Sequence, residues 1–199
     1  MFARSTVTIP ILILVPALTL RSQAAHQGQR YCAWDDGRPF RITQDSVGPF
    51  SVITVLGKLR SACPGARDTL MVGEESYSPA VSFHFRGQTV VAAQQDHDSL
   101  ESDDIADTWI IRGRKALLPQ GVTMSSTWSA LRAAYGPATG MSGSEVVVMF
   151  CKMPRMFFTL SADPESVGDV GAHGVSLIPD TTTIKEVQIS PHGLGGWVC

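Results

Sequence analysis

Thr54-Val-Leu-Gly-Lys-Leu-Arg-Ser-Ala-Cys-Pro-Gly-Ala66 is the stretch that organises the chain, because a similar stretch occurs in the second half. The second copy is Ser126-Thr-Trp-Ser-Ala-Leu-Arg-Ala-Ala-Tyr-Gly-Pro-Ala138. When Leu131 is aligned with Leu59, three further identities coincide: Arg132 with Arg60, Ala134 with Ala62, and Ala138 with Ala66. A segment repeated at a fixed period indicates a duplicated structural unit. We therefore expect two related modules in one chain.

Both copies are predicted to form short helices. In the first copy Thr54 is a suitable N-cap, and Pro64 with Gly65 ends the helix. Its apolar residues fall on one side at helical spacing: Val55, Leu56, Leu59, Ala62 and Cys63. In the second copy Trp128, Leu131 and Tyr135 share one face. A helix of about ten residues is marginal on its own, so each should pack against a sheet.

Alternating apolar and polar residues predict the strands that follow each helix. After the first helix we expect strands at 81–86 and 89–93, a tight turn at Gly87-Gln88, and a third strand at 108–112. After the second helix we expect a hairpin of 145–151 and 155–160, a loop at 161–174, an apolar segment at 175–179 and a last strand at 184–189. The predicted fold class is α+β, with two tandem helix-plus-antiparallel-sheet modules.

Residues 1–25 have the pattern of a secretory signal peptide. Arg4 precedes an uncharged segment, Val7 to Leu20, and small residues surround a cleavage point after Ala24 or Ala25. This segment is too short to span a bilayer comfortably, and an uncleaved anchor is the alternative. We assign the rest as follows: 26–46 to an irregular lead-in, 47–117 to module 1, and 118–199 to module 2 with a C-terminal tail.

The overall charge argues against two classes of partner. Residues 1–24 hold two arginines and no acidic residue, so their removal leaves 14 basic and 18 acidic residues, a formal charge of −4. A mildly acidic surface disfavours nucleic acid and anionic lipid as ligands. We expect a protein or a cell-envelope component as the partner and membrane contact only through the signal segment. The oligomeric state does not follow from the sequence.

Four cysteines in an exported chain indicate two disulfides. No two of them have the Cys-x-x-Cys spacing of a zinc or redox motif. Three pairings are possible, and we favour Cys32–Cys63 with Cys151–Cys199, because each bond then closes within one half of the chain.

An acidic run is the best candidate for a metal site. It contains Asp96, Asp98, Asp103 and Asp104, with His97 among them. Clustered carboxylates suit calcium, but the glycine and terminal glutamate of an EF-hand loop are missing. A solvated loop or a partner contact is the favoured interpretation, and calcium is the one cofactor considered.

The order of features in each copy resembles a known family. A glycine-containing lead, a Thr or Ser cap, leucine in a short helix, a Gly or Cys-Pro stop and a hairpin resemble the tandem modules of secreted β-lactamase-inhibitory proteins. The pattern, over residues 46–190, is also similar to SmpA/OmlA-type outer-membrane assembly lipoproteins. The resemblance implies a binding role and a disulfide from each helix end to a following strand. Cys63 matches the helix-end position in the first half and Cys151 the strand position in the second, which leaves Cys32 and Cys199 to substitute.

Two further sets of residues carry expectations. Arg60 and Arg132 occupy equivalent positions, and we expect their stems to lie over the sheet edge with the guanidinium groups in water. A carboxylate partner across the module interface is the alternative. The tryptophans are expected mostly in core or tail packing, and a pair exposed together would mark a protein-binding hot spot: Trp34, Trp109, Trp128 and Trp197.

The sequence contains no nucleophile elbow, zinc-protease motif or phosphate-binding loop. We therefore expect a secreted or periplasmic, non-enzymatic binding protein that meets its partner through a sheet surface or the acidic loop. The alternative is an exported hydrolase or metal-dependent enzyme that uses His97 and neighbouring carboxylates.

Overall fold

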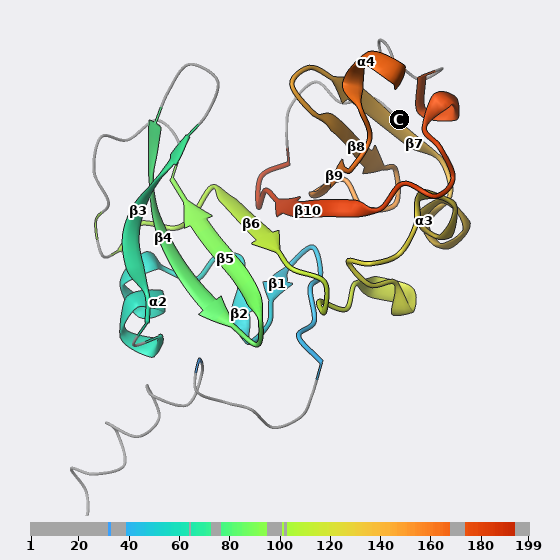
Figure 1. The fold of residues 1–199 in the computed structure, drawn as a ribbon. Helices are drawn as coiled ribbons and strands as arrows, with labels where there is room; N and C mark the ends of the chain where they lie inside the picture. The colour runs from blue at the N-terminus through green and yellow to red at the C-terminus, as the bar shows by residue number, and fades with distance from the viewer. Residues whose placement is uncertain are drawn as a thin grey trace, which may run out of the picture.

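The computed structural model describes residues 32, 39–63, 65–72, 77–94, 101, 103–167 and 174–193 (Figure 1). The predicted signal segment and most of the lead-in lie outside these residues. The described elements, in chain order, are β1 (Ser46–Val47), β2 (Phe50–Ser51), α2 (Leu56–Ala62), β3 (Arg67–Val72), β4 (Tyr77–Phe85), β5 (Gln88–Ala93), β6 (Thr108–Arg112), the 3-10 helix η1 (Pro119–Gly121), α3 (Trp128–Tyr135), β7 (Ala138–Ser142), β8 (Val146–Phe150), β9 (Met156–Leu160), α4 (Pro164–Val167), the 3-10 helix η2 (Gly174–Leu177) and β10 (Ile184–Ile189). None of these helices has the length and apolar character needed to cross a bilayer.

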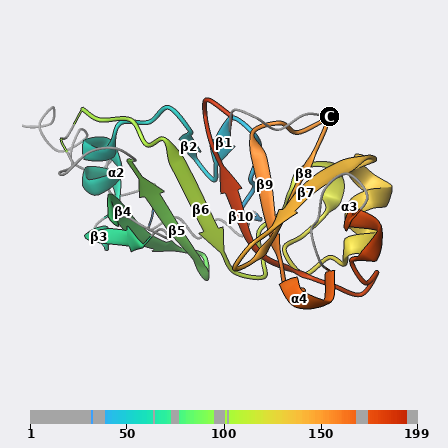
Figure 2. The same cartoon turned by 90° about the horizontal axis from the view of Figure 1, so that it is seen from above.

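Eight strands of the described residues form one antiparallel sheet in the order β3-β4-β5-β6-β10-β9-β8-β7. Strands β3 to β6 follow α2 along the chain, and β7 to β10 follow α3 (Figure 2). The two halves join where β6 pairs with β10, with Ile110 opposite Gln188. The short strands β1 and β2 form a separate hairpin. The predicted combination of few helices with an antiparallel sheet is confirmed.

Each helix begins on the backbone that leads into the last strand of its half. The N–H of Leu56, the first residue of α2, donates to the carbonyl of Asp104 at 2.8 Å. The N–H of Trp128, the first residue of α3, donates to the carbonyl of Thr182 at 2.6 Å. Because the first N–H groups of a helix have no partner inside it, these contacts fix where each helix starts relative to β6 and β10.

The core lies between the helices and one face of the sheet. Leu59 of α2 and Leu131 of α3 are both 0% exposed. The same hydrophobic cluster contains residues from both halves of the sheet: Val81, Phe83, Val90, Trp109, Val148, Phe158 and Val187. Trp109 and Trp128 are buried as expected, whereas Trp34 and Trp197 lie outside the described residues.

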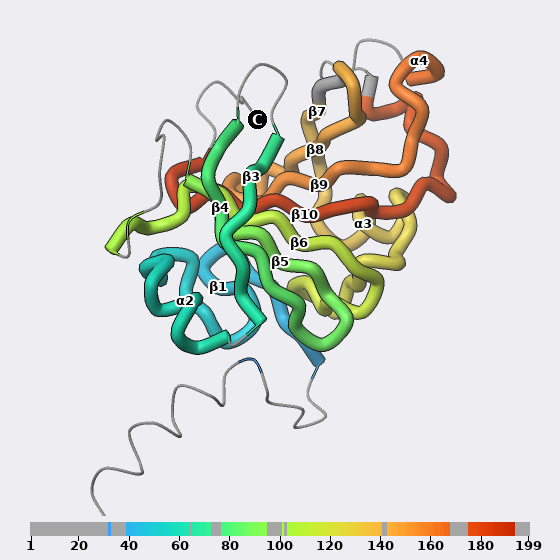
Figure 3. The backbone as a smooth tube through the Cα atoms, turned by 60° about the vertical axis from the view of Figure 1, so that its left-hand side comes forward, coloured from blue at the N-terminus to red at the C-terminus, as the bar shows by residue number. Residues whose placement is uncertain are grey.

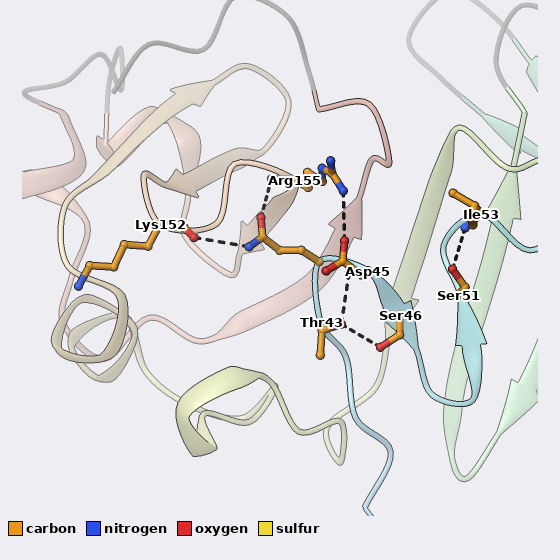
Figure 4. A network of polar contacts seen from close by, with 8 residues as sticks. Thr43, Asp45, Ser46, Ser51, Ile53, Lys152 and Arg155 are labelled. Atoms are coloured by element: carbon orange, nitrogen blue, oxygen red, sulfur yellow. Dashed lines mark hydrogen bonds and ion pairs between the residues drawn. The ribbon is translucent and has the colours of Figure 1, made fainter.

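The segment before β1 connects the first half of the chain to the turn between β8 and β9 (Figure 4). The Arg155 guanidinium donates to the Asp45 carboxylate at 3.1 Å, and the Arg155 N–H donates to Oε1 of Gln44 at 3.3 Å. The Gln44 amide donates to the Lys152 carbonyl at 3.5 Å. The predicted boundary at residue 47 falls inside β1, which begins at Ser46.

The start of α2 differs from its prediction. Val55, not Thr54, is the N-cap, and no side chain caps this helix of seven residues. In α3 the N-cap is Thr127, whose Oγ1 accepts from the Ala130 N–H at 3.4 Å. Valine has no side-chain acceptor, so the start of α2 depends on the backbone of Asp104.

The strand predictions need two corrections. Strands β3 and β7, which directly follow the two helices, were not expected. The β4–β5 turn lies at Arg86-Gly87, one residue earlier than predicted, with φ angles of 51° and 74°. Two successive positive φ values are typical of a type I′ turn, whose twist suits a two-residue hairpin. The apolar segment 175–179 overlaps the 3-10 helix η2.

The predicted Cys32–Cys63 disulfide is confirmed, and its two Cα atoms are 4.9 Å apart. Cys63 is the C-cap of α2, and its N–H donates to the Leu59 carbonyl at 3.0 Å. The bond therefore fixes the end of α2. Cys151 is also disulfide-bonded, and its predicted partner, Cys199, lies outside the described residues.

Tyr135 fixes the far end of α3 through a hydrogen bond of its side chain. Its side chain is fully buried, and its hydroxyl donates to the Pro119 carbonyl at 2.8 Å. Burial disfavours the phenolate and raises the pKa of Tyr135 above its ordinary range. The unfolded chain ionises this group at about pH 10. The stabilisation is therefore complete below about pH 10 and is lost as the pH rises further.

Replacement of Tyr135 by phenylalanine is expected to lower the free energy of unfolding by about 1 kcal/mol at neutral pH, because the Pro119 carbonyl loses its donor. It should also reduce the fall in stability as the pH rises above about 10. Urea unfolding across this pH range measures both effects. Tyr77→Phe, at an exposed tyrosine, is the control and should keep the wild-type slope. An unchanged slope in Tyr135→Phe would contradict this role.

Candidate interaction surface

In the described part of the predicted acidic loop, Asp104 forms hydrogen bonds with backbone N–H groups. The Asp104 carboxylate accepts from the Glu101 N–H at 2.7 Å, and the Asp104 carbonyl accepts from the Leu56 N–H. Asp96, His97 and Asp98 lie outside the described residues. Asp103 is described, but no group of three or more His, Cys, Asp or Glu side chains that could hold a metal occurs in the part of the chain that the structure describes.

Strand β3 is an open edge of the sheet (Figure 3). It pairs with β4 on one side, from Arg67 opposite Ser82 to Val72 opposite Tyr77. On its other side no strand among the described residues pairs with it. All of its residues are exposed except Met71, which is half-buried. An edge strand presents unpaired backbone N–H and C=O groups to which another strand can bond.

Three large apolar side chains lie exposed on this edge, and together they form what we call the β3 patch. Leu70 is 61% exposed, Val72 is 71% exposed and Tyr77 is 69% exposed. Leu70 and Val72 are two residues apart and so point to the same face. Tyr77 is the cross-strand partner of Val72 and shares that face. Contiguous exposed apolar side chains mark interaction sites more often than isolated ones do.

The β3 patch is exposed because α2 is too short to cover it. Counting along β4, Tyr77 is on the same face as Val81 and Phe83, which belong to the core. The nine residues of β4 extend over about 30 Å. The seven residues of α2 extend over about 10 Å. The β3 patch is therefore the continuation of the core face beyond the reach of the helix.

Another exposed apolar residue lies at the same end of the sheet. Ile105 is 41% exposed. Ile105 precedes β6 and bridges to the residue before α2. The N–H of Gln94, at the end of β5, donates to the carbonyl of Pro79, near the start of β4. The end of β5 therefore lies beside Pro79 of β4, which is the cross-strand partner of Leu70 in the β3 patch.

The opposite edge of the sheet differs from β3. Strand β7 contacts η2, so this edge has a neighbouring element. Leu177 of η2 is 62% exposed, and it lies in the other half of the chain from the β3 patch. The described side of β7 is half-buried at Ala138, Thr139 and Gly140, whereas β3 is exposed over most of its length.

The two equivalent arginines each have a carboxylate partner within their own half. Arg60 donates to the Asp68 carboxylate at 2.8 Å, and this ion pair links the end of α2 to the start of β3. Arg132 pairs with Asp180, and its guanidinium also lies over the Trp128 ring. Within the described part of the chain, neither arginine pairs across the interface between the halves. Both pairs are partly exposed, and such pairs contribute about 0–1 kcal/mol.

The comparisons with known proteins concern the fold alone. No protein-family model matches the chain, and no curated protein sequence matches it. Its structure is similar to that of the uncharacterized protein yfeY from Escherichia coli, with a TM-score of 0.52 and 11% sequence identity. The match covers 75% of this chain and 99% of the yfeY chain. At this identity the chain shares an architecture with yfeY, and the likeness carries no functional assignment.

Proposed function

We propose that the chain is an exported, non-enzymatic binding protein made of two tandem modules, and that it binds an extended segment of another protein along β3. The observation that carries the proposal is the exposed apolar edge formed by β3. Backbone pairing with an open edge supplies affinity, and the alternate side chains of the added strand supply specificity.

The tandem arrangement is supported first by the helices. Val55, before α2, bridges to Ile105, and Thr127, before α3, bridges to Thr183. The alignment that places Leu131 on Leu59 also places Thr127 on Val55, as the sequence repeat requires. The two bridge partners of the helices, Ile105 and Thr183, are separated by slightly more residues than Val55 and Thr127 are. The segment between the helix and this bridge is therefore slightly longer in the second module.

The β6–β10 pairing provides a second, independent support. The offset that carries Ile105 onto Thr183 also carries Trp109 onto Val187 and Ile111 onto Ile189. The ladder pairs Trp109 with Ile189 and Ile111 with Val187. When each residue is replaced by its equivalent in the other module, the Trp109–Ile189 pair becomes the Val187–Ile111 pair, and the reverse also holds. Such a pattern is expected for two copies related by an internal two-fold axis, by analogy with isologous interfaces in dimers.

Export to the periplasm or the cell exterior is supported by two features of the N-terminal part. Residues 1–25 have the order of a signal peptide: a basic start, an apolar segment and small residues. The disulfide between Cys32 and Cys63 is of a kind that forms and persists in oxidising compartments. An envelope location also agrees with the resemblance to secreted inhibitory proteins and to assembly lipoproteins of the outer membrane.

The chemistry of β3 indicates what the added strand should contain. The β3 patch suits a segment with apolar side chains at alternate positions, which would meet Leu70 and Val72. At the other end of β3, the exposed Arg67 has no ion pair within the described part of the chain. An acidic side chain at one end of the added segment would complement it. We therefore propose a strand about as long as β3, apolar at one end and acidic at the other.

Selection from a random peptide library displayed on phage tests this proposal. Enriched peptides should contain alternating apolar residues with an acidic residue at one end. Their addition should slow amide hydrogen exchange in residues 67–72, because backbone groups of β3 become hydrogen-bonded. Leu70→Lys/Val72→Lys should weaken the binding of a selected peptide by about tenfold or more.

Leu177→Lys is the matched control, since Leu177 is as exposed as Leu70 but lies on η2 in the other half. This variant should bind the peptide like the wild type. Peptides that bind Leu70→Lys/Val72→Lys with unchanged Kd would refute the proposal. Light scattering measures whether the protein forms a dimer. A dimer that is lost in Leu70→Lys/Val72→Lys would show that β3 binds a second copy of the chain, and this result would also contradict binding of another protein.

A further inference from the structure

A cleft of about 520 Å³ opens where the two halves of the sheet meet, far along the chain from β3. Segments from four places form its walls: the loop after β6, the loop before α3, the end of β9 and the start of β10. Its lining residues are Gly113, Arg114, Met124, Ser125, Ser161, Thr183, Ile184 and Lys185. The volume lies within the range of sites for small molecules.

Arg114 is held at this cleft by a fixed backbone. Gln88 is fully buried, and with the amide oxygen and nitrogen of its side chain exchanged it donates to the Gly113 carbonyl at 3.2 Å and accepts from the Lys115 N–H at 3.3 Å. A Cβ at residue 113 would lie 2.2 Å from the side-chain amide of Gln88, so only glycine permits this close approach. The Arg114 side chain has no ion pair with any other described residue.

The start of β10 brings a second cation to the cleft. The β9–β10 pairing is irregular between Ile184 and Glu186, which leaves Lys185 outside the regular ladder. Bulges of this kind redirect a side chain and occur often beside functional sites. Lys185 forms an ion pair with Glu145. The neighbouring Arg112 is engaged by Glu186 at 2.7 Å.

Hydroxyl groups line the rest of the polar wall. The Ser161 N–H donates to the Thr183 carbonyl at 2.9 Å, so these two residues lie side by side. The hydroxyls of Ser161 and Thr183 have no partner among the described residues. Ser125 adds a third hydroxyl, which lies 3.0 Å from Oγ1 of Thr123. Hydroxyls can donate to and accept from the hydroxyl groups of a ligand.

We propose that this cleft binds a small anionic sugar, with the acidic group of the sugar on Arg114. The guanidinium fork matches a phosphate or a carboxylate in a bidentate manner. Lys185 is paired with Glu145, but its ammonium has further N–H donors. The hydroxyls of Ser161, Thr183 and Ser125 suit the sugar hydroxyls. A bare inorganic anion would leave most of the volume empty, and a neutral sugar would leave Arg114 without a partner.

Isothermal titration calorimetry of the purified protein tests the proposal with four probes: glucose 6-phosphate, glucuronate, glucose and inorganic phosphate. At least one of the two anionic sugars should bind about tenfold or more tightly than both glucose and inorganic phosphate. Arg114→Ala should remove this preference. The result distinguishes whether the acidic group is a phosphate or a carboxylate.

Arg41→Ala is the matched control, because Arg41 is also an exposed arginine without an ion pair in the described residues, but it lies before β1. This variant should bind the anionic sugar like the wild type. Equal weakening in both variants would indicate general charge attraction and refute the site. If inorganic phosphate binds as tightly as the anionic sugars, the proposal that the ligand is a sugar is refuted. None of these outcomes depends on peptide binding at β3, so the two proposals can fail separately.

Discussion

Leu59→Ala and Leu131→Ala are each expected to lower the free energy of unfolding by about 2–5 kcal/mol. Both leucines are fully buried in the same hydrophobic cluster. Each belongs to a helix that is too short to be stable alone, so the packing of this side chain on the sheet holds the helix in place. Urea unfolding followed by circular dichroism and by tryptophan fluorescence measures the change.

The pair also tests whether the two halves depend on each other. Because β6 and β10 are hydrogen-bonded neighbours in one sheet, both variants should unfold in a single transition that the two probes report alike. Leu70→Ala is the control at an exposed position and should change stability by less than about 0.5 kcal/mol. A variant that melts only one half of the sheet in a separate transition would contradict a shared core.

The sequence predicted best the elements that contain a buried stripe. Leu59 and Leu131 recur at helical spacing beside further apolar residues, and α2 and α3 occur where this pattern places them. Strand β4 alternates between core residues such as Phe83 and polar residues such as His84. The burial of one face imposes such a period on the sequence, so the pattern could be recognised without the structure.

Strands β3 and β7 were missed because they lie at the two edges of the sheet. Strand β3 has no buried residue, so burial imposes no period of two on its sequence. Its strand conformation comes from pairing with β4, which a local pattern does not record. The one-residue error in the β4–β5 turn has a similar cause, because the turn is fixed by the register in which Phe85 opposes Gln88.

The candidate surfaces could not be predicted for a different reason. Leu70 and Val72 look like core residues in the sequence, and their exposure results from the short reach of α2. The cleft combines Arg114 and Lys185, which are far apart in the chain and meet only because β6 pairs with β10. The sequence instead indicated the acidic run as the best candidate for a site, because carboxylates that are close together in the chain can be recognised without a structure.

Removal of the first disulfide, with Cys32→Ala and Cys63→Ala combined, is expected to lower the free energy of unfolding by about 3–4 kcal/mol. The bond closes a loop over a sequence separation of 31 residues, and its loss increases the conformational entropy of the unfolded chain. Cys63 is also the C-cap of α2 and is buried. The double substitution removes both thiols, so no unpaired cysteine remains at this site to react.

Comparison with chemical reduction separates this bond from the second one. Dithiothreitol acts on the Cys32–Cys63 bond and on the disulfide of Cys151, whereas the double variant removes the first alone. We expect reduction to destabilise the wild type more than the variant, because the variant has only one bond to lose. Equal stability of the variant and the oxidised wild type would show that α2 is held by packing alone.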